Sequence, residues 1–81
     1  MISCNHYDYF EIACMHRYLI KLVTKQGTII EGVATDMQPN TDRIECIKVS
    51  TNDGDTLIIL DEIQTLEALT ENPYFTKINF T

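Results

Sequence analysis

The hydrophobic pattern of the chain changes its period at Tyr18, and this change restricts the folds open to it. Before that point, the spacing of Tyr9, Ile12, Ala13 and His16 is that of one face of a helix. After it, short runs of branched and aromatic residues alternate with turn residues, as they do in strands. The sequence therefore predicts one N-terminal helix followed by a β-rich body.

The predicted helix has a start signal at Asp8, whose carboxylate can cap it. Glu11, three residues later, completes a pair that resembles a capping box, and the helix dipole favours both negative charges there. Asp8, Glu11 and Met15 fall on a face that we expect to point outward. We therefore expect a helix over about residues 8–16, preceded by Ile2 to Cys4, which can pair as an edge strand.

Five or six short antiparallel strands are predicted over residues 18–24, 28–37, 43–51, 56–60, 63–69 and 74–80. The segment 63–69 can equally form a helical turn, because its apolar residues have mixed periods. Lys25 to Gly27 predicts a tight turn, and Asp53-Gly54 suits a type I′ hairpin turn. Gly32 marks a bend or bulge inside its strand.

The expected fold class is mostly β with one N-terminal helix, as a strongly bent antiparallel sheet or a small open β-barrel. Residues 1–81 suffice for a single domain with a small core, in which the barrel body spans 18–80. Ile44, Cys46 and Val49 are expected to face that core. Alternate residues from Tyr74 to Phe80 are expected to share one face of the last strand.

Twelve acidic and six basic side chains give the chain a formal net charge of −6. An acidic domain repels phosphates, so we expect a basic protein partner and no direct binding of nucleic acid. The polar start of the chain predicts no signal peptide, and no apolar run reaches the length of a membrane span. The odd number of cysteines, three, is typical of reduced thiols in a cytoplasm.

The cysteines and histidines do not predict a metal site or a catalytic centre. Cys4, His6, Cys14 and His16 match none of the common zinc spacings. Cys14 and His16 are two residues apart on a helix and point in different directions, so they cannot pair for nucleophilic catalysis. We therefore expect no cofactor, no metal and no enzymatic activity.

Acidic side chains are the main surface feature, and two interpretations of them stay open. They form either a solvated face that keeps the domain soluble or a surface for a partner. Tyr7 beside Asp8 favours a partner surface, because a rigid aromatic ring with an adjacent charge is a common interface anchor. The set comprises Asp8, Glu11, Asp61, Glu62, Glu67 and Glu71.

The segment Gly27 to Asn40 is similar to the first motif of Sm and Sm-like proteins, through Gly27, Gly32, Asp36 and Asn40. This resemblance implies an Sm-like fold and, as an alternative function, an RNA-binding module that can form a ring. The Arg-Gly pair of the second Sm motif is absent, since Asp61-Glu62 follows the fourth strand.

A second resemblance covers nearly the whole chain. The pattern Ile2-x-Cys4-x-x-Tyr7-Asp8-x-x-Glu11-x-Ala13-Cys14-x-His16, followed by a β-rich body, resembles the Rof (YaeO) family of Rho-binding antiterminators. Those are small acidic bacterial proteins with an N-terminal helix on an Sm-like open barrel. The resemblance implies inhibition of the transcription termination factor Rho, by binding near its primary RNA-binding site and hindering RNA loading.

The same resemblance implies which residues contact the partner. Tyr7, Asp8 and Glu11 carry the motif, Asn5 and His6 precede the predicted helix, and His16 and Arg17 lie at its far end. Cys4, Ala13 and Cys14 are implied to seat the helix on the body. We accordingly expect a cytoplasmic regulator that binds Rho and is a monomer when free.

Overall fold

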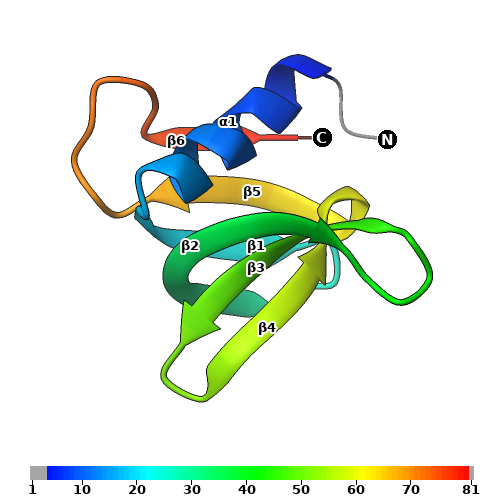
Figure 1. Cartoon of the computed structure of the whole chain (residues 1–81). Coiled ribbons are helices and arrows are strands. Elements are labelled where there is room, and N and C mark those ends of the chain that lie inside the picture. Colours follow the sequence, from blue (N-terminus) through cyan, green and yellow to red (C-terminus); the bar gives the residue numbers. More distant parts are fainter. Residues whose placement is uncertain (1–3, 81) are drawn as a thin grey trace.

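The computed structural model describes residues 4–80 and places one helix against one open antiparallel sheet (Figure 1). The sheet has six strands in the order β4-β3-β2-β1-β5-β6, which confirms the predicted fold class. No helix in this part of the chain is long and apolar enough to cross a membrane. The elements are α1 (Cys4–Met15), β1 (Leu19–Thr24), β2 (Ile29–Pro39), β3 (Glu45–Thr51), β4 (Gly54–Ile59), the 3₁₀ turn η1 (Leu60–Glu62), β5 (Ile63–Ala68) and β6 (Lys77–Asn79).

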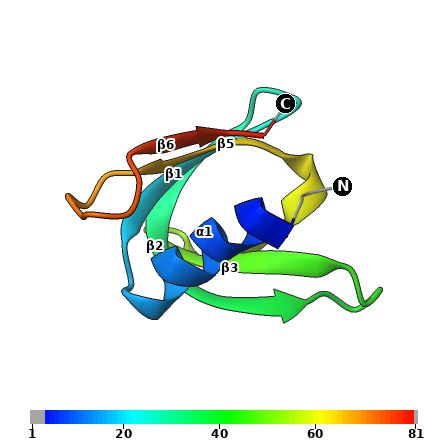
Figure 2. The ribbon, with the colours of Figure 1, turned by 90° about the horizontal axis from the view of Figure 1, so that it is seen from above.

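The core lies in the hollow of the bent sheet. The helix α1 crosses this hollow, with β5 and β6 on one side of it and β2 and β3 on the other (Figure 2). Phe10 and Ala13 of the helix are fully buried there against residues of every long strand. Gly32 makes the bend possible, because a Cβ at this position would overlap the Ser50 carbonyl oxygen and lie 2.7 Å from Val49 Cγ1. The bulge itself lies further along β2, between Ala34 and Asp36.

The helix differs from its prediction in its start and in its buried face. It begins at Cys4, so Asp8 lies inside it with an exposed side chain, and the capping role expected for Asp8 is wrong. Contacts with the sheet extend the helix upstream, because the His6 ring lies edge-on to Phe80, with ring centroids 5.1 Å apart. The edge strand expected at Ile2 to Cys4 lies outside the described residues, apart from Cys4, which opens the helix.

Of the two predicted glycine turns, the one at Gly27 is confirmed and the type I′ turn at Gly54 is not. Gly27 has φ of 90°, and its N–H donates to the Thr24 carbonyl at 2.9 Å. Gly54 has φ of 111°, but Asn52 and Asp53 before it do not have positive φ. A type I′ turn needs positive φ at both central residues, so the type I′ prediction is wrong, although the hairpin is where it was expected.

The C-terminal strand is shorter than predicted because a turn formed by an asparagine side chain precedes it. Asn72 Oδ1 accepts hydrogen bonds from the backbone N–H groups of Tyr74 and Phe75, at 2.9 and 3.1 Å. This turn buries Phe75 and leaves Tyr74 exposed, so Tyr74 does not share a strand face with Ile78. The expected inward position of Ile44, directly before β3, is also wrong, since Ile44 is 45% exposed.

Candidate partner-binding groove

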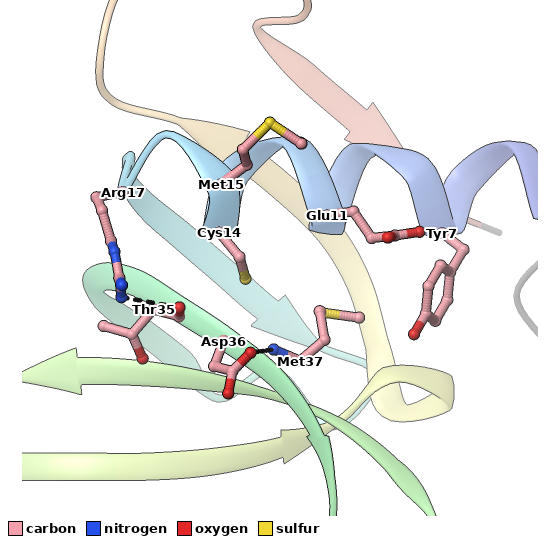
Figure 3. Close-up of a pocket in the computed structure, with 8 residues that line it drawn as sticks. All are labelled: Tyr7, Glu11, Cys14, Met15, Arg17, Thr35, Asp36 and Met37. Carbon is pink, nitrogen blue, oxygen red and sulfur yellow. Dashed lines mark hydrogen bonds between the residues drawn. The ribbon is translucent and has the colours of Figure 1, made fainter.

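A groove runs between α1 and β2 and is open to solvent along its length (Figure 3). Its volume is about 540 Å³. One wall is α1, the other is the bulged part of β2, and Arg17, two residues after the end of α1, lies at one end. We call it the α1–β2 groove. Its lining residues are Tyr7, Glu11, Cys14, Met15, Arg17, Thr35, Asp36 and Met37.

On the helical wall, Tyr7 bridges α1 to the start of β3. Its hydroxyl donates a hydrogen bond to Glu45 Oε1 at 3.2 Å. Burial raises the pKa of the phenol, and the negative charges of Glu45 and Glu11 raise it further. The ring is therefore a neutral aromatic surface beside two carboxylates, one on the helix and one on the sheet.

At the far end of the groove, Arg17 ends the helix in a left-handed conformation, with φ of 55°. The backbone N–H of Tyr18 donates to the Ala13 carbonyl at 3.0 Å, and that of Arg17 to the Cys14 carbonyl at 3.3 Å, which is a Schellman ending. Glycine is the usual residue at this position, so arginine is held there against a conformational preference. Its Nη1 donates to the Thr35 carbonyl at 2.8 Å.

The wall formed by β2 owes its shape to the bulge. Thr35 is the extra residue between Ala34, which pairs with Val49, and Asp36, which pairs with Lys48. A bulge re-aims neighbouring side chains, and here Asp36 is exposed and lines the groove (Figure 3). Asp36 Oδ1 accepts a hydrogen bond from the Met37 backbone N–H at 2.8 Å, which orients the carboxylate.

Cys14 forms the buried floor of the groove, and its chemistry is that of an apolar residue. Burial, followed by the nearby charge of Asp36, raises the pKa of its thiol to about 11, while Arg17 acts in the opposite direction. The thiol is therefore protonated at neutral pH, and a protonated thiol is neither a nucleophile nor a metal ligand. The packing role implied for Cys14 and Ala13 agrees with their burial.

The structure brings some of the predicted contact residues together and separates others. Tyr7, Glu11 and Arg17 line the groove, and Asp8 lies exposed beside Tyr7 on the same helix. Asn5 belongs to the first turn of α1. The two histidines point elsewhere: the ring of His6 lies against Phe80, and that of His16 stacks with those of Tyr18 and Tyr74, at centroid distances of 5.4 and 5.6 Å.

Sequence reasoning missed the sheet side of this groove. Thr35, Asp36 and Met37 were not expected as contact residues, because a bulge is not visible in the strand pattern. On the helix a signal was present, since Tyr7, Glu11 and Met15 are spaced by four residues and so share a face.

The wider acidic set is distributed over several elements. Asp61 and Glu62 belong to η1, Glu67 lies on β5 and Glu71 follows it. Within residues 4–80, no three or more His, Cys, Asp or Glu side chains are grouped so that they could hold a metal ion.

Comparisons with known proteins agree with this architecture. The profile of the family described as modulator of Rho-dependent transcription termination (ROF) matches residues 1–80. The chain belongs to the ROF family. A solved structure, YaeO bound to magnesium from Vibrio cholerae O395, is 39% identical, covers 93% of this chain and 97% of its own, and superposes with a TM-score of 0.89. No curated protein matches the chain.

Membership of the ROF family establishes the general function, modulation of Rho-dependent transcription termination. This family is regulatory, and the α1–β2 groove is lined by an aromatic ring, two thioethers, a thiol and charged groups.

Proposed function

We propose that this ROF protein inhibits Rho-dependent termination by binding Rho through the exposed side of α1 and the adjoining groove. Bound there, it hinders the loading of RNA at the primary RNA-binding site of Rho. The observation that carries this proposal is the orientation of α1. Phe10 and Ala13 are buried in the sheet, so the motif residues Tyr7, Asp8 and Glu11 lie on the opposite and lateral sides of the helix.

The electrostatics of this side suit a protein that normally binds RNA. A surface that binds single-stranded RNA is basic and contains apolar or aromatic places for bases to stack. Asp8 and Glu11 supply carboxylates for such cations, and Tyr7 supplies a ring beside them. The net charge of −6 adds a long-range attraction that speeds the encounter and weakens with salt. Inhibition then requires occupancy of the surface and no catalysis.

The main test is replacement of Asp8. Because Asp8 lies inside α1 and does not cap it, Asp8→Lys should leave the fold intact, and it places a cation three residues from Glu11. We expect this variant to lose binding to Rho in a pull-down and by calorimetry. The matched control is Glu71→Lys, which makes the same change in net charge on the exposed loop before β6.

Normal binding of Rho by Asp8→Lys would show that the proposed contact is wrong. Equal losses in both variants would show that only the overall charge matters. Circular dichroism and thermal melting check that each variant is folded.

The proposed mechanism is tested by competition. Labelled cytidine-rich RNA is bound to purified Rho, and the protein is added while fluorescence anisotropy is followed at two salt concentrations. We expect the RNA to be displaced, less effectively at the higher salt. Binding to Rho without displacement would contradict hindered RNA loading. Binding of the RNA by the isolated protein would instead favour the Sm-like alternative.

A further inference from the structure

The two walls of the α1–β2 groove offer different chemistry to one guest. Tyr7 on the helix and Met37 on β2 provide an aromatic ring and a thioether, while Glu11 of α1 and Asp36 of β2 provide carboxylates. Apolar walls with charged rims suit a long amphipathic side chain, whose stem packs and whose head pairs.

The charges of the groove act on a common region. Glu11, Arg17 and Asp36 all line the groove, so two carboxylates and one cation share the same open space. Arg17 is already engaged with the Thr35 carbonyl at 2.8 Å. The carboxylates that line the groove therefore outnumber its cation.

From this geometry we infer that the groove receives one cationic side chain of the partner, an arginine, between Glu11 of α1 and Asp36 of β2. The inference rests on the proposed function and deepens it, since it makes β2 part of the surface that contacts Rho. Arginine is favoured over lysine because a planar guanidinium can stack on the Tyr7 ring while it donates to carboxylates. Arg17 repels a second cation and so limits the groove to one.

The oriented carboxylate of Asp36 makes the inference specific. Its Oδ1 is fixed by the Met37 N–H, so the group is held before the partner arrives and loses little freedom on binding. Asp36→Asn preserves the shape and an oxygen that can accept this hydrogen bond, but it removes the charge. Glu31→Gln is a matched control, because Glu31 lies exposed on the same strand, outside the groove, and the change in net charge is identical.

The first experiment measures the affinity of Rho for wild type, Asp36→Asn and Glu31→Gln over a series of salt concentrations. We expect Asp36→Asn to weaken binding about tenfold, as for the loss of one charge-assisted hydrogen bond, and Glu31→Gln to weaken it less than about twofold. Equal affinities for the two variants would overturn the inference. Failure of the wild-type protein to bind Rho would instead overturn the proposed function.

A second experiment needs no Rho. N-acetyl-arginine amide is titrated into the ¹⁵N-labelled protein, with N-acetyl-lysine amide as the comparison. We expect saturable shifts confined to amides around Tyr7, Asp36 and Met37, larger for the arginine compound, and lost in Asp36→Asn. Shifts that do not saturate, or that are equally large around Glu31, would contradict an arginine site in the groove.

Discussion

The two sides of the bent sheet use charged residues in opposite ways. On the outer side, Lys77, Glu67, Lys21 and Glu31 are directly opposite one another on β6, β5, β1 and β2, so the charges alternate in sign across four strands. On the inner side, where α1 lies, Glu11 and Asp36 share the groove with a single cation, Arg17.

This difference shows where the net charge of the molecule is available to a partner. Opposite charges in cross-strand register stabilise the sheet and cancel each other at a distance. Arg17 cancels only part of the negative charge that lines the groove, and the backbone there is irregular, with a bulge at Thr35 and a left-handed residue at Arg17. Regular pairing thus belongs to the face that maintains the fold, and unbalanced charge and strained backbone belong to the face that we propose binds Rho.

The largest expected effect tests whether the groove depends on the docking of α1. Phe10 is fully buried and stacks on Phe80, with ring centroids 5.1 Å apart. Phe10→Ala should lower the free energy of unfolding by about 3–5 kcal/mol, measured by urea denaturation. Hydrogen exchange then sharpens the comparison, because we expect amides of α1 to lose protection before those of β1 and β5.

Uniform loss of protection in Phe10→Ala would show that helix and sheet unfold together. The sheet and the helical wall of the groove would then not differ in stability.

A smaller effect concerns the strain at Arg17. Arg17→Ala and Arg17→Gly both remove the guanidinium and its hydrogen bond to Thr35, but only glycine adopts positive φ freely. Arg17→Gly should therefore be more stable than Arg17→Ala by about 1 kcal/mol, which corresponds to roughly 4–8 °C in the melting temperature of a domain of this size. Equal melting temperatures would show that the left-handed conformation stores no strain.

The fold was largely predictable from sequence because it depends on local patterns. The change of period at Tyr18, the glycine turn at Gly27 and the hairpin before Gly54 all lie where the sequence places them. The start of α1 was missed because contacts of His6 with Phe80, far away in the sequence, extend the helix past the capping signal at Asp8.

Only the helical half of the candidate site was predictable, because the other half depends on contacts between residues far apart in the sequence. Tyr7 and Glu11 share a helical face that can be derived from spacing alone. Asp36 and Met37 join them only because the sheet bends and bulges, and this depends on the close approach of β3 to Gly32. Tertiary geometry of this kind leaves no periodic trace in the sequence.

The smallest expected effect tests the outer face directly. Lys21→Glu replaces the central cation of the alternating row and brings like charges opposite both Glu31 and Glu67. We expect a loss of about 0.5–1 kcal/mol in the free energy of unfolding at low salt, which shrinks as salt screens the repulsion. Lys25→Glu is the control, because Lys25 is exposed in the β1–β2 turn and the change in net charge is the same.

Measuring the affinity of the same two variants for Rho tests which face of the sheet contacts the partner. If the outer face maintains the fold and the groove binds the partner, Lys21→Glu and Lys25→Glu should bind Rho equally well, although only the first is less stable. A specific loss of Rho binding in Lys21→Glu would place the partner on the outer face and reverse the comparison. Equal binding would agree with recognition of the carboxylates on the exposed side of α1 and in the groove, because neither variant changes them.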